Sequence, residues 1–413
     1  MKKLKILHIN ASDTGSTGKI VLEICHEADK RGYECVSLFP KQNRKPSEHI
    51  KEYTTSLPFE QGIYRRFYYI YGLHYGFAPL STAKILRILK HERPDVVHLH
   101  SINCAMVNIY RLLSFLKKQG IATVLTNHAE FFYTGNCPHA LDCEKWKNGC
   151  GDCPRLFYAS DSKLFDRTHT AWIKMKAAFA NHPNLSVVSV SPWVYNRSVL
   201  SPILEGVSQT TILNGVRADV FYRRLQTDAR GLLGLGDGKI ILHVTANFSD
   251  SESDSKGGIY ILKLAERMKD VTFIVAGKHG QIDNLPSNVI LVGVISDQQT
   301  LGAYYSAANL TVVTSHRETF GMSVAESLSC GTPVVGFESG GSESIAIDEY
   351  SEFVPFADLD SLETAIRGKW LDFKNDNTSE SIAGTAKEKY SSEIMAKQYC
   401  DLYEKMTREG NDK

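Results

Sequence analysis

The chain has 413 residues, 43% of them hydrophobic and 23% charged, and a net charge of +1 at pH 7. This length allows two or three domains, and the composition is that of a soluble globular protein. The balanced charge argues against a nucleic-acid partner, and no apolar run reaches the length of a membrane span. The apolar run in MKKLKILHIN is interrupted by His8 and Asn10, so we expect no signal peptide and a cytoplasmic protein.

The first forty residues predict a strand, a helix and a second strand: LKILHIN, STGKIVLEICHEADKRG and YECVSLF. Further near-continuous apolar strands are predicted at 95–100, 121–128 and 185–191. Strands of this kind are typical of a parallel sheet that is covered by helices on both faces.

The pattern then starts again. Strands are predicted at 239–248, 271–278, 288–295, 309–315 and 333–339, and helices at 257–270, 298–308 and 322–330. Two such series predict an α/β protein with two Rossmann-like, doubly wound domains. We expect domains at 1–195 and 208–380, a linker within 191–206, and a helical segment at 381–413 that returns to the first domain. Ligands should bind in a cleft at the carboxyl ends of the strands.

A glycine-containing turn, DTGSTGKI, follows the first strand. Its spacing is wrong for a P-loop, because only two residues separate Gly15 from Gly18 and Ile20 follows Lys19. The turn is either a plain tight connection or a place where the backbone approaches a phosphate or sugar at a helix N-terminus. Gly15 and Gly18 are the candidates for that contact.

The matching loop of the second domain, NFSDSESDSKGG, carries Lys256 just before a predicted helix. A lysine at this place can neutralise a diphosphate. The alternative is a mobile surface loop with a solvated lysine.

Two carboxylates, Glu318 and Glu326, have seven residues between them in SHRETFGMSVAESLSCGTPVVGF. Thr319, Phe320 and Gly321 are poor helix-interior residues, so we predict a loop through Gly321 and a helix that starts near Met322. Glu318 would then lie on a loop at the cleft, and Glu326 about one turn into the helix. Both could accept hydrogen bonds from sugar and ribose hydroxyls. A metal site is disfavoured because no histidine or aspartate completes a ligand set nearby.

Four of the nine cysteines are bunched in GNCPHALDCEKWKNGCGDCP, at 135–154: Cys137, Cys143, Cys150 and Cys153. A structural zinc site, disulfides and free thiols are the alternatives, with zinc better suited than disulfides to a reducing compartment. The other five are predicted to be reduced core thiols: Cys25, Cys35, Cys104, Cys330 and Cys400.

Seven aromatic residues crowd the stretch GIYRRFYYIYGLHYGF, at 62–77, beside Arg65 and Arg66. A buried aromatic helix, a surface that approaches a membrane-bound acceptor, and a platform for acceptor sugars are the alternatives.

The stretch ETFGMSVAESLSCGTPVV resembles the E-x7-E region of the retaining glycosyltransferases of family 4, which have the GT-B fold of two Rossmann-like domains. The resemblance extends to other segments: DVVHLHS, TNHAEFFYTGNC, VSPWVYNRSVL, TILNGVRADVF and DSKGG. The cysteine-bearing stretch is most similar to enzymes of bacterial exopolysaccharide synthesis, such as those of the colanic-acid type.

The resemblance implies roles for individual residues. Glu318 would contact the donor sugar, Glu326 the ribose, and Lys256 the leaving diphosphate. His128 would touch the transferred sugar near the reacting carbon. The backbone that meets sugar and phosphate would come from a single run of residues: Phe320, Gly321 and Met322.

The sequence departs from the family at two places. Asn247 stands where the family usually has an arginine, and Lys278 or Arg317 could supply the missing charge. The run GGSESI, at 340–345, places Glu343 one position earlier than the family's Gly-Gly-x-Pro-Glu. Weaker donor binding and activity that depends on a partner are the two consequences that these changes suggest.

The resemblance implies a retaining hexosyltransferase of bacterial surface polysaccharide synthesis. It would use a UDP-, GDP- or ADP-linked sugar and a glycan or lipid-linked oligosaccharide as acceptor, with no catalytic metal and with peripheral association at the inner face of the membrane. The alternatives are a non-catalytic nucleotide-sugar-binding protein and a nucleotide-sugar epimerase on the same scaffold.

Overall fold

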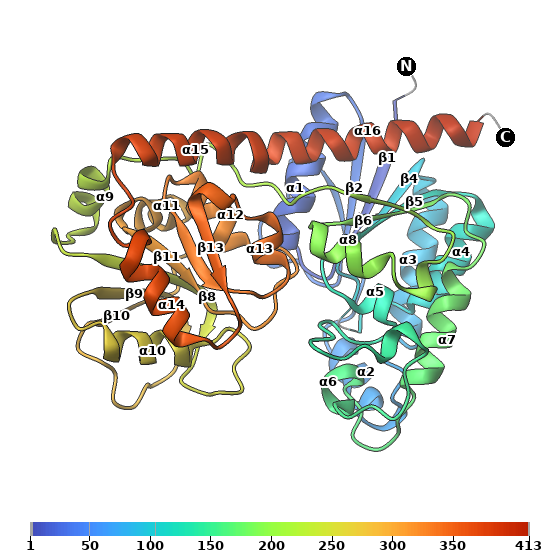
Figure 1. Cartoon of the computed structure of the whole chain (residues 1–413). Coiled ribbons are helices and arrows are strands. Elements are labelled where there is room, and N and C mark those ends of the chain that lie inside the picture. Colours follow the sequence, from blue (N-terminus) through green and yellow to red (C-terminus); the bar gives the residue numbers. More distant parts are fainter. Residues whose placement is uncertain (1–2, 49, 104, 412–413) are drawn as a thin grey trace. The chain divides into compact units, whose positions relative to one another are not determined.

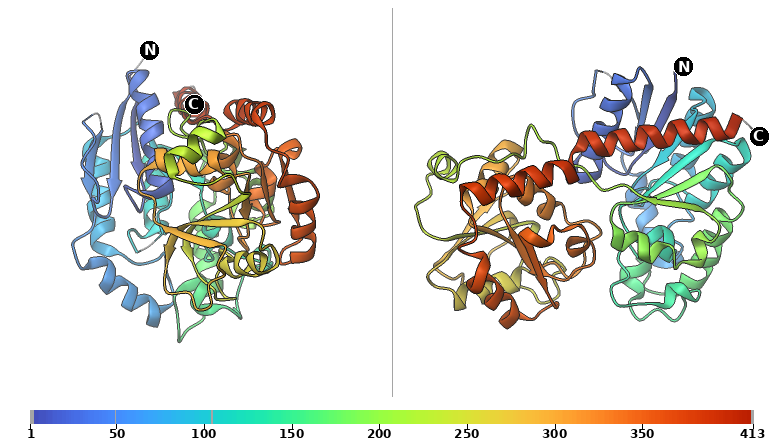
Figure 2. Two further views of the ribbon diagram at one scale, coloured as in Figure 1. Left: turned by 90° about the vertical axis from the view of Figure 1, so that its left-hand side faces the viewer. Right: turned by 45° about the horizontal axis from the view of Figure 1, so that its top comes forward.

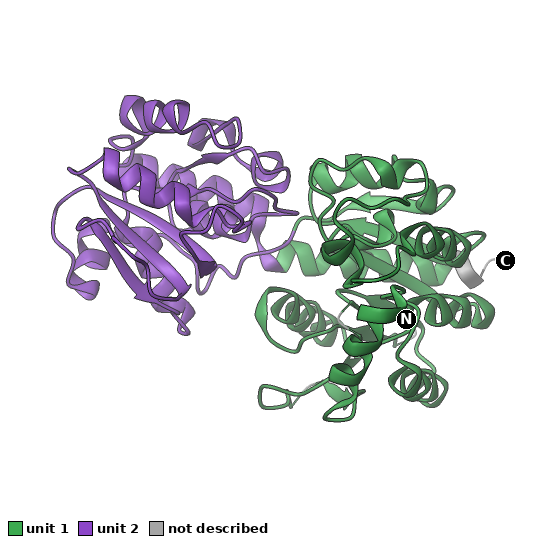
Figure 3. Cartoon of the chain, turned by 90° about the horizontal axis from the view of Figure 1, so that it is seen from below, with its two compact units in different colours: residues 1–213, 393–413 green, residues 214–392 purple. Residues whose placement is uncertain are grey.

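The computed structural model describes residues 3–48, 50–103 and 105–411, so Cys104 lies outside the described part of the chain. The chain forms two compact units (Figure 3). Unit 1 comprises residues 1–213 and 393–413, and unit 2 comprises residues 214–392. The stretch 191–206, which we predicted to be the linker, therefore lies inside unit 1.

Unit 1 is built on a parallel sheet with the strand order β3-β2-β1-β4-β5-β6-β7. The strands are β1 (Lys5–Ile9), β2 (Glu34–Phe39), β3 (Lys51–Thr54), β4 (Val96–Leu99), β5 (Ala122–Asn127), β6 (Leu185–Ser189) and β7 (Ser208–Thr211). The central strands are almost wholly buried, which explains their continuous apolar sequences.

Helices α1 (Gly15–Lys30) and α16 (Ser392–Asn411) cover one face of this sheet (Figures 1 and 2). Their apolar residues form one core with the strands, and Arg31, the C-cap of α1, pairs with Asp401 and Glu404 of α16 at 2.8 and 2.9 Å. The C-terminal helix α16 thus packs in unit 1, whereas residues 381–392 of the predicted returning segment belong to unit 2. The other helices of unit 1 are α2 (Glu60–Tyr71), α3 (Pro79–Glu92), α4 (Ile109–Gln119), α5 (Phe131–Thr134), α6 (Leu156–Ser160), α7 (Thr168–Phe179) and α8 (Pro192–Ser198).

Unit 2 repeats this plan with the order β10-β9-β8-β11-β12-β13, again all parallel. Its strands are β8 (Ile240–Phe248), β9 (Thr272–His279), β10 (Val289–Gly293), β11 (Leu310–Val313), β12 (Val334–Phe337) and β13 (Ser351–Val354). Its α-helices are α9 (Gln226–Leu233), α10 (Gly258–Arg267), α11 (Gln298–Ala307), α12 (Met322–Ser329), α13 (Gly341–Ile345), α14 (Leu359–Ala365) and α15 (Asp376–Tyr390). The predicted fold class, two Rossmann-like parallel sheets, is confirmed.

The order of strands reverses between β1 and β4 in unit 1 and between β8 and β11 in unit 2. Loops that leave adjacent strands on opposite sides of such a point diverge and leave room for a ligand at the carboxyl edge of the sheet. Across the described residues, no helix combines the length and the apolar character needed to cross a membrane.

Candidate functional site

The candidate site of unit 2 lies at the point where its strand order reverses. Lys256 lies on the loop that follows β8, and Glu318 lies on the loop that follows β11. The Lys256 Nζ is 2.6 Å from Glu318 Oε1, and the two side chains are 34% and 21% exposed. Lys256 and Glu318 are 62 positions apart in the sequence, where each was predicted separately as a site residue. The structure places their side chains in direct contact.

Hydrogen bonds fasten these loops to each other. His316 N donates to the Ser255 carbonyl at 2.8 Å, and Thr314 Oγ1 donates to the carbonyls of Lys256 and Gly257 at 3.2 and 3.0 Å. The loop that contains Lys256 is thus held in place at its base, which argues against the alternative of a freely mobile surface loop.

The Glu318 backbone is fixed by a second contact, with the loop that follows β12. Its N–H donates to the Ser339 carbonyl at 3.0 Å, and its carbonyl accepts from Gly341 N at 2.8 Å. This short parallel bridge holds both the N–H and the carbonyl of Glu318. It thereby fixes the backbone from which the carboxylate extends.

Glycines allow the three loops to meet backbone to backbone. A Cβ at Gly257 would lie 2.1 Å from the Thr314 carbonyl oxygen, and one at Gly341 would lie 2.3 Å from the Thr319 carbonyl carbon. Neither position has space for a side chain. Gly321 adds a positive φ of 87° immediately before α12.

Helix α12 begins at Met322, as predicted, with Gly321 as its N-cap. Gly257 is likewise the N-cap of α10, and neither helix has a side chain that caps its first N–H groups. Uncapped helix N-termini attract anions through their N–H groups and the helix dipole. Phe320 is buried beneath this turn.

Glu326 lies in the second turn of α12 and is half-buried. Tyr305 of α11 donates to its Oε2 at 3.0 Å, and burial raises the pKa of Tyr305, which keeps the phenol as a donor. Tyr305 thus orients Glu326. We did not single it out from the sequence, where it lies among the ordinary apolar residues of a helix.

Asn247, at the family's arginine position, is exposed near the end of β8. Its partner in the register of β9 is Lys278, which is also exposed. Lys278 thus lies beside Asn247, and its supply of the missing charge stays a prediction. Arg317, the other candidate, directly precedes Glu318 and is half-buried.

Glu343 has a structural role that the sequence did not reveal. Its two carboxylate oxygens accept from Ser339 N at 2.9 Å and from Gly340 N at 2.6 Å. The carboxylate therefore stabilises the turn that carries Gly341 against the Glu318 loop. Glu343 therefore supports the loop of Glu318, although it stands one position earlier than the glutamate of the family pattern.

Unit 1 holds the remaining predicted site residues. Helix α1 begins at Gly15, with a φ of 71°, and a Cβ at Gly18 would lie 2.7 Å from the carbonyl carbon of Asp13. Both glycines are thus required by the turn itself, and their contact with a donor stays a prediction. Asp13 accepts from Asn43 and Arg44 backbone N–H groups at 2.6 and 3.1 Å, which holds this turn in place.

His128 directly follows β5 and is half-buried. Its Nε2 lies 3.2 Å from Nδ1 of His100, a fully buried residue that directly follows β4. Burial lowers the pKa of His128 to about 3, so the ring is neutral at physiological pH.

The four clustered cysteines share one loop region of unit 1 and are half-buried free thiols. Burial is the main cause that raises the pKa of Cys137, and the three neighbouring thiols raise it further. Among the described residues, ligand atoms come within 4.8 Å of one another in threes at His8, His98 and His100 and at His8, Cys25 and Cys35, not at the clustered cysteines. The zinc site stays a prediction. Of the predicted core thiols, the four that the structure describes are buried and free.

The aromatic stretch is only partly buried. Tyr64 and Tyr68 of α2 pack inward, whereas Ile63, Phe67 and Ile70 are about half exposed. The prediction of a buried aromatic helix therefore holds for one face of α2 alone. A cavity of about 260 Å³ lies beside this helix and is lined by aromatic and polar side chains: Arg65, Tyr69, His74, Tyr75, Asn103, Pro138, Tyr158 and Asp161.

Two family models match the chain, one in each unit. Residues 17–197 match the model described as Glycosyltransferase Family 4, and residues 248–370 match the model described as Glycosyl transferases group 1. A D-inositol 3-phosphate glycosyltransferase of Thermobifida fusca is 28% identical over 171 residues, and the match covers 37% of each chain. The chain thus spans little more than a third of the length of that relative.

Solved structures resemble the whole chain. Sucrose-phosphate synthase from Thermosynechococcus elongatus has a TM-score of 0.71 at 18% identity, over 98% of this chain and 99% of its own. HepE from Anabaena, solved in complex with UDP-glucose, has a TM-score of 0.64 at 15% identity, over 97% and 100%. The chain therefore has the GT-B fold, and each of its two units matches a glycosyltransferase family model over part of its length.

Proposed function

We propose that this protein is a retaining glycosyltransferase that moves a hexose from a nucleotide-diphosphate sugar to a glycan or lipid-linked oligosaccharide of bacterial surface polysaccharide synthesis. The observation that carries the proposal is the Lys256–Glu318 pair, set among glycine-built loops at the strand reversal of unit 2. The two family domains and the fold shared with a UDP-glucose complex support it.

The chemistry follows from where charge develops. As the glycosidic bond to the diphosphate breaks, negative charge grows on the leaving group and positive charge on the sugar. Lys256 and the uncapped N-termini of α10 and α12 would stabilise the diphosphate, and Lys278 could add charge beside Asn247. Because these groups supply a positive field, transfer is expected to persist in EDTA.

The carboxylates would fix the donor. Glu318 would accept hydrogen bonds from the sugar hydroxyls, and Glu326, oriented by Tyr305, would accept from the ribose. His128 of unit 1 would contact the transferred sugar. Retention of the anomeric configuration would follow from a path in which the acceptor attacks the face of the sugar that the diphosphate leaves. We prefer this path because the described residues at the site include no evident covalent nucleophile.

The acceptor is proposed to bind in the cavity beside α2. Tyr69 and Tyr158 provide rings on which sugars can stack, and Arg65, Asn103 and Asp161 provide hydrogen-bonding groups. Pro138 from the cysteine-bearing loop also lines the cavity. That loop would therefore shape acceptor binding without taking part in the reaction.

Peripheral binding to the inner face of the membrane is proposed for a surface that we name the α2 patch. It consists of large apolar side chains that are about half exposed or more: Phe59, Ile63, Phe67, Ile70, Tyr71, Phe157, Leu164 and Phe165. Ile63, Phe67 and Ile70 are spaced i, i+4 and i+7, so they form one stripe of α2.

Contacts between segments make the α2 patch continuous. The rings of Tyr69 and Phe157 stack at 5.9 Å, and a Cβ at Gly72 would lie 2.6 Å from the Phe165 carbonyl oxygen. Basic side chains surround it: Arg65, Arg66, Lys163 and Arg167. An apolar stripe with basic neighbours is typical of a helix that lies in the interface of an anionic membrane.

Transfer is tested directly by incubating the protein with UDP-, GDP- and ADP-linked sugars and a bacterial lipid-linked oligosaccharide fraction. Acceptor-dependent release of a nucleoside diphosphate with a glycosylated product is expected. Lys256→Ala should abolish it, whereas Lys263→Ala, an exposed lysine on α10, should retain it.

The non-catalytic binding protein remains the second candidate, since Asn247 removes one charge from the donor site. Tight nucleotide-sugar binding without any glycosylated product across the donor panel would favour it over the transferase. Conversion of the free nucleotide sugar to its epimer in the absence of acceptor would favour the epimerase.

A further inference from the structure

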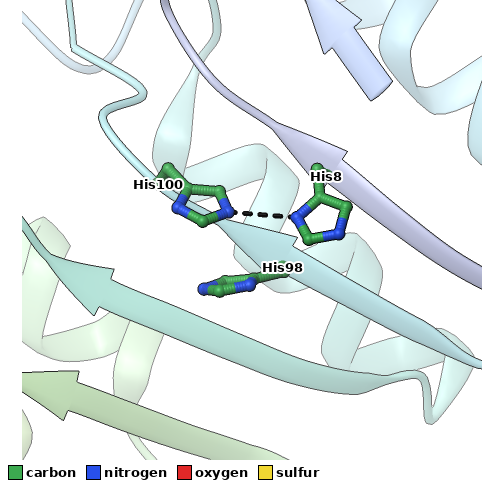
Figure 4. Close-up of side chains that lie close together, drawn as sticks. All are labelled: His8, His98 and His100. Atoms are coloured by element: carbon green, nitrogen blue, oxygen red, sulfur yellow. Dashed lines mark hydrogen bonds between the residues drawn. The ribbon is translucent and has the colours of Figure 1, made fainter. Parts of the chain in front are cut away.

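Three histidines of unit 1 form an unbroken chain of ring contacts that starts inside the core. His8 Nδ1 lies 3.1 Å from His100 Nε2 (Figure 4), and His100 Nδ1 lies 3.2 Å from His128 Nε2. His8 and His100 are fully buried, and His128 is half-buried. The chain therefore connects the centre of the sheet to the residue proposed to contact the donor sugar.

His98 lies beside this chain but is not part of it. Its Nδ1 is 2.6 Å from Tyr403 Oη, and its Nε2 is 2.7 Å from Thr126 Oγ1. Both ring nitrogens of His98 are thus engaged by hydroxyls. The group of His8, His98 and His100 is consequently a poor metal site, although the three rings lie close together (Figure 4).

The number of protons on His100 restricts which partner donates in each of the two hydrogen bonds between the histidines. Burial and the neighbouring histidines lower the pKa of His100 well below its usual range, so its ring carries one proton. With one proton, His100 can donate to only one of its two neighbours and must accept from the other. Either His8 donates to His100 and His100 donates to His128, or both bonds run the opposite way.

The environment of His8 decides between these directions. Its Nε2 is buried and has no hydrogen-bond partner, and the thiols of Cys25 and Cys35 lie close to the His8 ring. The reversed chain would place a proton on this nitrogen, which would leave a buried N–H that only sulfur, a weak acceptor, could satisfy. The forward chain leaves a bare acceptor nitrogen instead, and an unpaired buried acceptor occurs in proteins more often than an unpaired buried N–H.

We propose that His100 is a positioning residue that holds His128 as the Nδ1–H tautomer, with His128 Nε2 accepting a hydrogen bond from His100 Nδ1–H. The tautomer itself does not depend on the proposed function, but its consequence for sugar binding rests on that function. His128 then contributes a hydrogen-bond donor at Nδ1 to a sugar oxygen, and it does not act as a proton-accepting base through Nε2.

The tautomer is measured in the full chain labelled with 15N-histidine, by spectra that correlate the ring protons with both ring nitrogens. His128 is assigned by its loss in His128→Gln. His243 is an internal reference, because its Nδ1 lies 3.0 Å from the Val312 carbonyl oxygen and must carry the proton. We expect the two nitrogens of His128 to show the same pattern as those of His243. A proton on His128 Nε2 in the wild-type protein would overturn the proposal.

Two variants distinguish a specific positioning role of His100 from a general disturbance of the surrounding structure. His100→Leu should reduce the Nδ1–H population of His128 and lower kcat by between about tenfold and a hundredfold, with the affinity for the free nucleotide within twofold of wild type. His98→Gln, next to the chain but outside it, should leave the tautomer of His128 unchanged. An equal tautomer change in both variants would contradict a specific role for His100. The wild-type spectrum needs no turnover, so it decides the proposal even if transfer is absent.

Discussion

Lys256 Nζ and Glu318 Oε1 are 2.6 Å apart in a pair that is partly exposed, with 34% and 21% of the side chains accessible. A pair of this exposure contributes at most about 1 kcal/mol to stability. A diphosphate can therefore displace the carboxylate from the ammonium at little cost. The pair preserves two opposite charges, one suited to phosphate and the other to hydroxyl groups.

Lys256→Ala and Glu318→Gln should separate these two roles. Loss of a charge-assisted bond to phosphate costs about 1.5–3 kcal/mol, so Lys256→Ala should weaken binding of the preferred nucleoside diphosphate by about tenfold to a hundredfold. Glu318→Gln should leave that affinity within twofold but reduce affinity for the nucleotide sugar. Isothermal titration with both ligands measures the difference. The exposed Lys263→Ala and Glu266→Gln are the matched controls, and equal losses for both ligands in Glu318→Gln would contradict its assignment to the sugar.

Tyr305→Phe tests whether the orientation of Glu326 matters for nucleotide binding. The phenol donates to Glu326 Oε2 at 3.0 Å from a fully buried ring. Its removal should weaken the binding of the nucleoside diphosphate by about 1.5 kcal/mol, or about tenfold. Tyr304→Phe, on the same helix, is the control. Retained affinity in Tyr305→Phe would show that Glu326 does not depend on this bond.

Gly341→Ala should disrupt the site through sterics alone. The added Cβ would lie 2.3 Å from the Thr319 carbonyl carbon, so the loop that carries Glu318 must move. Gly384→Ala, inside helix α15 with nothing within 4 Å of its Cβ, should be neutral or stabilising by up to about 1 kcal/mol. Thermal unfolding and nucleotide titration are expected to show loss of binding only in Gly341→Ala. Full binding in this variant would mean that the loop contact is not needed.

The fold could be predicted from the sequence wherever strands are buried on both faces. The strands that we missed, β3, β7 and β13, all lie at sheet edges, and their sequences are KEYT, SQTT and SEFV. An edge strand needs no continuous apolar run, because one side of it has no neighbouring strand. The sequence signal for these strands is therefore weak for a physical reason.

The candidate site could be predicted in part. Gly321 correctly predicted the end of the loop and the start of α12. The contact of Lys256 with Glu318, the support by Tyr305 and the histidine chain could not be predicted, because they depend on which strands are neighbours. The contacts in unit 2 depend on the crossover that places β8 next to β11, and the histidine chain of unit 1 depends on the order β1-β4-β5. Neither strand order can be predicted from the local sequence.

Introducing negative charge into the α2 patch tests membrane binding. A double variant, Phe67→Glu with Ile70→Glu, replaces two exposed apolar side chains on the stripe of α2 with carboxylates. It should lose co-sedimentation with vesicles rich in phosphatidylglycerol, because apolar burial is lost and anionic lipid repels the new charges. Leu232→Glu, which alters a highly exposed leucine in unit 2, should bind like wild type.

Salt provides a second check on the same surface. Each basic side chain near an anionic bilayer contributes about 1 kcal/mol, and this contribution is screened by ions. Arg65→Gln with Arg66→Gln should therefore weaken binding most at low ionic strength. Wild-type binding that is equal on neutral and anionic vesicles would contradict the electrostatic part of the proposal.

Buried histidines should make the protein less stable in mild acid. Burial lowers the pKa of His128 to about 3 and that of His243 to about 4, whereas in the unfolded chain a histidine titrates near 6.5. The unfolded state therefore binds more protons between these values, and stability is lost as the pH falls below about 6.5. Each such histidine should contribute a loss of about 1.4 kcal/mol per pH unit.

Urea unfolding at pH 7.5, 6.5 and 5.5 measures this dependence, and His243→Gln isolates one contribution. This variant should be less stable than wild type at pH 7.5, because the ring is buried and Nδ1 donates to Val312. Its further loss of stability between pH 6.5 and 5.5 should be smaller than that of wild type by about 1 kcal/mol, because glutamine does not titrate and the unfolded histidine is only half protonated at pH 6.5. His279→Gln, at an exposed ring in the same unit, should keep the wild-type slope. A wild-type slope in His243→Gln would show that this histidine binds its proton equally well in the folded and unfolded states.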